Sequence, residues 1–354
     1  MVTEFNCTEL NTYSSSFYCA CRNNDVDEVK NCLKIISLDK INKIEKNGST
    51  ALHAASFYNH SEIVSLLLQY GAVRSQINKY KCTPCEEAKT SEIQKLFIGS
   101  SSGNNRFGGD QNSQIEWMLD GSNAERETAE QLQWYTNAGN IINLQCQLNE
   151  IRKDYLDKEL SDMEGIQKIR WFINKAIEEN DPVYLLKAYT AETDFYKILN
   201  KQLATVHIDR PDYRESWQAR RRIVYIISCD PDLAQFRFAD RTYRGMKLTE
   251  NDLQQYVVGS RLMNKSFMST SKDRLIAKKF VLGNDSVKQT YSTLCTYHII
   301  NNRSSLDLGD ISEYADEREV VILPYCLFEV IGIKKHRTKL FSTIQIEIEL
   351  KQCY

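Results

Sequence analysis

A unit of 33 residues begins twice in succession near the start of the chain, and this repeat constrains the fold more than any other feature. Thr50 opens the first unit, and Thr83 opens the next one period later. Small residues follow Thr50, an aliphatic stripe ends at Leu66-Leu67-Leu68, and Gly71 closes the unit. Small residues let helices pack closely, the stripe is buried between neighbouring units, and the glycine permits a left-handed helix end. The repeat therefore predicts a stack of short helices.

Residues 47–79 resemble an ankyrin repeat, and the segment from Tyr18 to Leu33 shows the same helix pattern one unit earlier. The resemblance implies that His53 bonds the backbone and orders the turn, rather than binding a ligand. It also places Cys85 at an apolar position in the first helix of the next unit. Because each repeat needs neighbours to bury its face, we expect the array to dock on the second domain or on a partner protein.

The chain divides into three predicted segments. Residues 1–98 are the predicted ankyrin-repeat domain. Residues 99–114, GSSSGNNRFGGDQNSQ, are rich in Gly, Ser and Asn and predict a flexible linker. Residues 115–354 are the predicted second domain, and a length of 354 residues suits two domains.

Helical signals precede strand signals in residues 115–354. A short segment at 115–119 opens the helical part, and helices are expected over 169–177, stopped near Asn180-Asp181-Pro182, and over 184–199. The pattern changes after Pro211. Strands are then predicted over the segments 293–300, 320–323, 328–333 and 344–350. Helices first and strands afterwards predict an α+β domain.

Two carboxylates stand before one of these strands. Glu317 and Glu319 precede the apolar run 320–323 and are separated only by Arg318. Residues two apart on an extended segment point the same way, so we expect both carboxylates to project from one face. A solvated charge cluster leading into a strand is the alternative.

An arginine and a serine-rich run precede the acidic pair. Arg244 follows an alternating apolar segment, and Ser269, Thr270 and Ser271 come next. The ordered set of arginine, Ser-Thr-Ser and Glu-x-Glu resembles the R-S-E class of mono-ADP-ribosyltransferases. The resemblance implies N-terminal helices over two packed β-sheets, with NAD bound between the sheets as the substrate, and implies no metal.

The chemistry of NAD explains why such residues are needed. Loss of nicotinamide leaves positive charge on the ribose, so the site needs a phosphate clamp and a carboxylate near the ribose. Arg244 suits the clamp, because its planar fork can hold a phosphate through two hydrogen bonds and stays charged. Gly245 would let the backbone approach the nicotinamide amide closely.

The resemblance supplies the remaining roles. It implies that Ser269 orients Glu319, and that Glu319 binds a ribose hydroxyl and stabilises the developing cation. It implies that Glu317 engages the acceptor, where a glutamate points to arginine as the acceptor. Phe280 is a candidate to stack on the nicotinamide, with core packing as an equal alternative. The Ser-Thr-Ser run also suits an N-cap for a helix over 272–280.

Composition limits the partners and the compartment. A formal charge of -2 predicts neither nucleic-acid binding nor attraction to anionic membranes. No apolar run approaches a membrane span, and the first residues show no secretory signal. Eleven cysteines, an odd number, favour reduced thiols in the cytoplasm over a disulfide framework. Cys82 and Cys85 are spaced like a metal or redox pair, but no second pair or matching histidines accompany them.

The sequence therefore predicts a cytoplasmic enzyme that transfers ADP-ribose from NAD to arginine side chains of acceptor proteins. The ankyrin repeats are expected to recruit the target or another protein partner. Two alternatives use the same residues. One is an NAD glycohydrolase, in which water replaces the acceptor, and the other is an inactive NAD-binding scaffold.

Overall fold

The computed structural model describes residues 15–98, 117–119, 143–205, 214–282, 290–336 and 343–353. The chain forms two compact units, residues 1–99 and 100–354. The predicted linker lies outside the described residues, so the predicted domain boundaries stay predictions. Of the helices that can be described, none is both long and apolar enough to cross a membrane.

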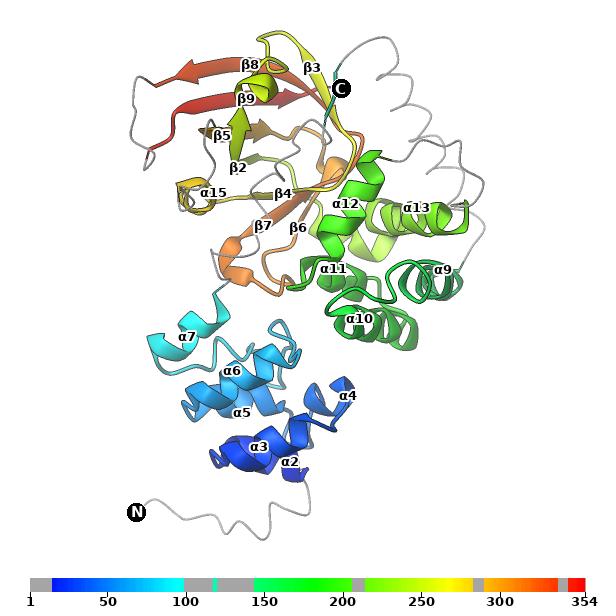
Figure 1. The fold of residues 1–354 in the computed structure, drawn as a ribbon, viewed down its shortest axis with the longest axis vertical. Coiled ribbons are helices and arrows are strands. Elements are labelled where there is room, and N and C mark those ends of the chain that lie inside the picture. Colours follow the sequence, from blue (N-terminus) through cyan, green and yellow to red (C-terminus); the bar gives the residue numbers. More distant parts are fainter. Residues whose placement is uncertain are drawn as a thin grey trace. The chain divides into compact units, whose positions relative to one another are not determined.

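Short helices make up the first unit (Figure 1). They are α2 (Ser16–Arg22), α3 (Val26–Leu33), α4 (Leu38–Ile41), α5 (Ala51–Phe57), α6 (Ser61–Gln69) and α7 (Ser91–Phe97). Their apolar faces share one core, in which Val29, Ala55 and Leu67 are fully buried. Gly71 has a φ of 93°, the left-handed conformation expected at the end of α6. The predicted stack of helices is therefore confirmed.

His53 orders the start of α5, as predicted. Thr50 Oγ1 and His53 Nδ1 lie 2.8 Å apart, and His53 Nε2 lies 3.0 Å from the backbone oxygen of Cys82. Burial lowers the pKa of His53 to about 4, so the ring is neutral near pH 7. This histidine links one repeat to the next.

The helix predicted around Cys85 is wrong. Residues 84–87 form a single turn, and the next helix, α7, starts only at Ser91. Thr83 and Glu86 close the turn, because each side chain accepts a hydrogen bond from the other residue's backbone N–H. Thr90 then caps α7, so no room remains for a longer helix between the two caps.

As predicted, the helices of residues 144–229 precede the main run of strands in the second unit. They are α9 (Leu144–Ile151), the π-helical η2 (Arg152–Leu156), α10 (Ile166–Glu179), α11 (Val183–Thr190), α12 (Phe195–Thr205) and α13 (Arg214–Cys229). α10 ends at Asn180, which has a φ of 51°, at the expected stop. The single helix predicted over 184–199 is wrong, because Thr193 accepts the N–H of Phe195 and starts α12. The break leaves Tyr189 and Thr190 at the end of α11.

The described strands form one sheet in the order β1-β3-β8-β9-β5-β2-β4-β7-β6. They are β1 (Trp117–Leu119), β2 (Arg241–Thr249), β3 (Arg261–Asn264), β4 (Met268–Ser271), β5 (Thr290–His298), β6 (Ser305–Asp307), β7 (Glu319–Ile322), β8 (Leu327–Lys335) and β9 (Ile346–Gln352). All four predicted strands are confirmed, as β5, β7, β8 and β9. Residues 117–119 are a strand paired with β3, not the predicted helical segment. The change from helices to strands comes after α13, later than predicted.

The two sheets implied by the resemblance are the two halves of this one sheet. β4, β7 and β6 form one half, and the remaining strands form the other (Figure 1). A single residue pair, Tyr243 with Ser271, joins β2 to β4. The α+β class is confirmed, and the junction between the halves is where the predicted site residues lie.

Candidate active site

Arg244 lies on β2 where the halves of the sheet separate. Its backbone is paired with Cys295 on β5, on the side away from β4. If the ladder with β4 continued beyond Tyr243, Gly245 would stand opposite Ser269. Instead the Arg244 guanidinium donates to the Ser269 carbonyl oxygen at 2.8 Å. Arg244 is 4% exposed, so this bond joins the two halves away from solvent.

Gly245 is required by helix packing. A Cβ on this residue would lie 2.2 Å from the carbonyl oxygen of Ala277 and 3.1 Å from the Cβ of Val281. Both residues belong to α15 (Arg274–Leu282), which lies against β2. The predicted close approach of the backbone is therefore present, but its neighbour is α15. Approach to the nicotinamide stays a prediction.

The Ser-Thr-Ser run is β4 itself. Ser269 stands opposite Val321, and Ser271 stands opposite Glu319 on β7. Opposite residues share one face of a sheet, so Ser269 and Glu319 are diagonal neighbours on the same face, with Cα atoms about 7–8 Å apart. Ser269 is 3% exposed. This placement suits the predicted role of Ser269, which stays a prediction.

The other two residues of the run support neighbouring backbone. Thr270 Oγ1 donates to the Val320 carbonyl at 2.7 Å, and Ser271 Oγ donates to the Glu317 carbonyl at 2.7 Å. The alternative role as an N-cap belongs to Asp273, whose side chain accepts the N–H of Leu275 in α15. Ser271 Oγ also accepts the N–H of Asp273 at 3.0 Å, so the run supports both the backbone of Glu317 and the residue that caps α15.

Glu319 is fully buried at the start of β7. Its carboxylate accepts a long hydrogen bond of 3.4 Å from the Ser312 hydroxyl, and its carbonyl accepts the Leu308 N–H at 2.8 Å. Ser312 was not among the predicted site residues. It lies on the loop between β6 and β7, seven residues before Glu319.

Glu317 is not on an extended segment, so the strand alternation predicted for the acidic pair is wrong. It closes the 3-10 turn η6 (Ala315–Glu317), and Arg318 after it is left-handed with a φ of 48°. The alternation of an extended strand does not apply across these three residues. Glu317 is 7% exposed, so the alternative of a solvated cluster is also wrong for this pair.

Tyr189 is a site residue that the sequence analysis missed. Its hydroxyl accepts a hydrogen bond from Asn200 Nδ2 at 3.1 Å and shares another with the Ser269 side chain. Burial is the main reason that the pKa of Tyr189 is raised to about 12; the charge of Glu319 acts in the same direction, and the hydrogen bond from Asn200 and the charge of Arg244 oppose it. All three predicted residues therefore act on one buried hydroxyl, Ser269 through a hydrogen bond and Arg244 and Glu319 through their charges. Aromatic residues at helical spacing usually form the core, so no pattern in the sequence distinguishes Tyr189 from a core residue.

Phe280 lies on α15 and is partly buried. It lies three residues after Ala277, the residue of α15 that contacts Gly245. Neither stacking on nicotinamide nor core packing is favoured by this position alone, so both stay open. Within the described parts of the chain, no three His, Cys, Asp or Glu side chains are grouped closely enough to hold a metal ion.

Comparisons with known proteins match two different families to the two parts of the chain. A family model of ankyrin repeats, in three copies, matches residues 3–98. A family model described as NAD:arginine ADP-ribosyltransferase matches residues 135–353, more than half of the chain. A comparison with curated proteins found no match.

Solved structures of bacterial proteins are similar to part of this chain at low identity. The Vis toxin, an ADP-ribosyltransferase from Vibrio splendidus, is 17% identical, with a TM-score of 0.38 over 58% of this chain and 85% of that one. Exoenzyme S from Pseudomonas aeruginosa is 18% identical, with a TM-score of 0.37 over 58% and 87%. The type III effector XopAI from Xanthomonas axonopodis pv. citri is 10% identical, with a TM-score of 0.40 over 67% and 95%.

Proposed function

The chain belongs to the NAD:arginine ADP-ribosyltransferase family, and from this premise we propose that it transfers ADP-ribose from NAD to arginine side chains of acceptor proteins. The bond between the anomeric carbon and nicotinamide breaks, and nicotinamide leaves with its electron pair. A bond from that carbon to a guanidine nitrogen forms, and the nitrogen loses a proton.

One observation supports this proposal most strongly. Arg244, Ser269 and Glu319 come from three different strands, Arg244 is bonded to the Ser269 carbonyl, and all three act on the buried hydroxyl of Tyr189. A fixed cation and a fixed carboxylate in a site shielded from water act strongly on charge that develops nearby. The set therefore suits a dinucleotide whose ribose becomes cationic as it reacts.

Each residue has a role in the proposed reaction. Arg244 binds the anionic pyrophosphate, for which its planar fork is suited. Ser269 orients Glu319, and Glu319 binds the ribose and stabilises the cation. Glu317 pairs with the acceptor guanidinium and helps to take its proton, which is needed because arginine is almost always protonated.

Agmatine, a simple arginine analogue, provides the direct test. We expect the purified chain to release nicotinamide from NAD and to form ADP-ribosyl-agmatine, detected by mass spectrometry. We expect Glu317→Gln to lower adduct formation about a hundredfold, because loss of a general base typically costs 10²–10⁴-fold. Nicotinamide release into water should fall much less, since Glu317 is assigned to the acceptor.

The control variant is Glu329→Gln on β8, which should match the wild type. Nicotinamide release with only free ADP-ribose would contradict the transfer and indicate the glycohydrolase. Absence of turnover, with NAD still raising the melting temperature, would indicate the inactive NAD-binding protein.

We propose that the ankyrin repeats recruit protein partners, and that the acceptor protein is one of these partners. Ile35 is 89% exposed and Tyr80 is 65% exposed, so large apolar side chains remain available on this unit. We expect Ile35→Ser with Tyr80→Ser to lower the labelling of proteins in a cell extract at least about threefold. Agmatine modification should be unchanged, and a parallel loss of both activities would contradict recruitment.

A cytoplasmic location is part of the proposal. Cys21 and Cys326 are buried free thiols, and burial raises the pKa of each to about 12. Because these cysteines form no disulfide bond, the protein needs no oxidising compartment in order to fold. Fractionation of cells that produce the protein is the check, and recovery outside the cytosol would contradict the assignment.

A further inference from the structure

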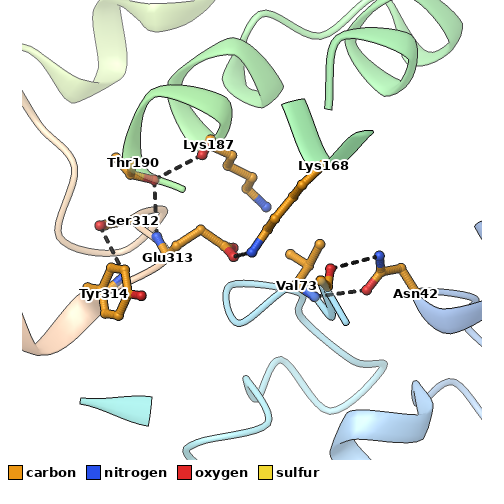
Figure 2. A network of polar contacts seen from close by, with 9 residues as sticks. Asn42, Val73, Lys168, Lys187, Thr190, Ser312, Glu313 and Tyr314 are labelled. Carbon is orange, nitrogen blue, oxygen red and sulfur yellow. Dashed lines mark hydrogen bonds and ion pairs between the residues drawn. The ribbon is translucent and has the colours of Figure 1, made fainter. Parts of the chain in front are cut away.

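The loop between β6 and β7 carries a buried acid, Glu313, that the proposed chemistry does not use. Glu313 is 2% exposed, and its carboxylate accepts a hydrogen bond from Lys168 Nζ at 2.9 Å. The Lys168 side chain, from α10, is only 10% exposed (Figure 2). Removing one partner of such a pair leaves a buried charge without compensation. The ion pair therefore fixes the loop to α10.

The end of α11 holds the same residue by its backbone. The Glu313 N–H donates to Thr190 Oγ1 at 3.1 Å, and Thr190 Oγ1 donates to the Lys187 carbonyl at 3.1 Å. Lys187 extends from α11 toward Glu313 (Figure 2). Burial lowers the pKa of the Lys187 ammonium, and the charge of Glu313 opposes that shift. One loop residue is thus held by two helices and faces two cationic side chains.

The contacts continue from Glu313 to the acidic pair. Ser312 Oγ accepts the Tyr314 N–H at 3.1 Å and donates to the Glu319 carboxylate. The Glu317 N–H donates to the Tyr314 carbonyl at 3.1 Å. The segment that presents Glu317 is therefore built directly on the anchored residue.

The two carboxylates differ in their support. Glu319 belongs to β7, where pairing with Ser271 on β4 fixes its backbone independently of the loop. Glu317 belongs to the 3-10 turn of the loop, with one further bond from Ser271 to its carbonyl. Release of the loop should therefore displace Glu317 more than Glu319.

We propose that Glu313 is a positioning residue that, through its ion pair with Lys168, decides how much ADP-ribose reaches the acceptor rather than water. This inference rests on the proposed function. In hydrolysis the oxygen of water bonds to the anomeric carbon and loses a proton, and nicotinamide leaves as it does in transfer. NAD cleavage needs Arg244 and Glu319, whereas transfer also needs Glu317 in place.

The test compares full-length Glu313→Gln, Lys168→Met and the double variant with the wild type, using NAD and agmatine. Each single change should lower the ratio of ADP-ribosyl-agmatine to free ADP-ribose about tenfold, while total nicotinamide release falls less than about threefold. The double variant should recover part of the ratio, because it removes both partners of the Lys168–Glu313 pair and leaves only Lys187 without the charge of Glu313. General instability would lower both products together and leave their ratio unchanged.

Glu178→Gln is the matched control. It removes a different ion pair of α10, the one between Lys175 and Glu178, in which the Glu178 side chain is 60% exposed. It should leave the ratio unchanged. If the single charge variants fail to fold, Thr190→Val keeps both charges and removes the bond to the Glu313 N–H, together with the local bond to the Lys187 carbonyl. A ratio within twofold of the wild type in the folded single variants would overturn the inference.

Hydrogen exchange of the loop amides tests whether Glu313 anchors the loop, independently of any enzymatic activity. Amides of residues 308–319 should exchange at least about tenfold faster in Glu313→Gln than in the wild type, and those of β5 should not change. Unchanged exchange would overturn the anchor itself. A wild type that releases no nicotinamide would instead overturn the proposed function, whatever the exchange rates of the loop.

Discussion

Glu319→Gln should lower nicotinamide release about a thousandfold and leave the fold intact. The change is isosteric, and the amide oxygen of glutamine can still accept the hydrogen bond from Ser312. What is lost is the negative charge beside the ribose. Loss of one group that stabilises a transition-state charge typically costs 10²–10³-fold, and here the group is fully buried, where such charges act most strongly.

The measurement is initial nicotinamide release at saturating NAD, with and without agmatine. Both rates should fall together, because Glu319 acts on NAD cleavage, which transfer and hydrolysis share. NAD should still raise the melting temperature of Glu319→Gln, since Arg244 is retained. Glu329→Gln serves again as the control, and a Glu319→Gln protein within tenfold of wild-type activity would contradict the assigned role.

Much of the second unit could be predicted from apolar periodicity. Four strands and most helices follow directly from it, since each element buries one face. The strand Trp117–Leu119 could not be predicted, because three residues are too few to show an apolar periodicity and the strand forms only by pairing with β3. The break between α11 and α12 was also missed, because the cap at Thr193 interrupts an otherwise continuous apolar pattern.

The site was predictable where the residues are chemically distinctive. Arg244, Ser269 and Glu319 are brought close to one hydroxyl, consistent with their predicted grouping. Tyr189 and Ser312 were not predicted, because a tyrosine on a helix and a serine in a loop are common, and the partner of Tyr189 lies far away in the sequence. Ser269 comes eighty residues after Tyr189, and only the folded sheet brings them together.

Gly245→Ala should be among the most destabilising single changes in the second unit. The new Cβ would lie 2.2 Å from the carbonyl oxygen of Ala277, a backbone atom that no rotamer change can move. Helix α15 would have to shift away from β2, and overpacking of this kind typically costs 1–3 kcal/mol, occasionally more. We expect a loss of about 3 kcal/mol, or roughly 6–12 °C in melting temperature for a domain of this size.

Gly332→Ala is the matched control in the same sheet. A Cβ there would meet only Glu349 Cβ at 3.8 Å, an ordinary contact, so its melting temperature should stay close to the wild type or rise slightly. This comparison distinguishes the two explanations for why residue 245 is a glycine. If the glycine serves helix packing, Gly245→Ala melts early even without NAD. If it serves only the approach of nicotinamide, the variant melts like the wild type and loses only the protection that NAD provides. Because the clash is with the main chain of α15, we expect the first result.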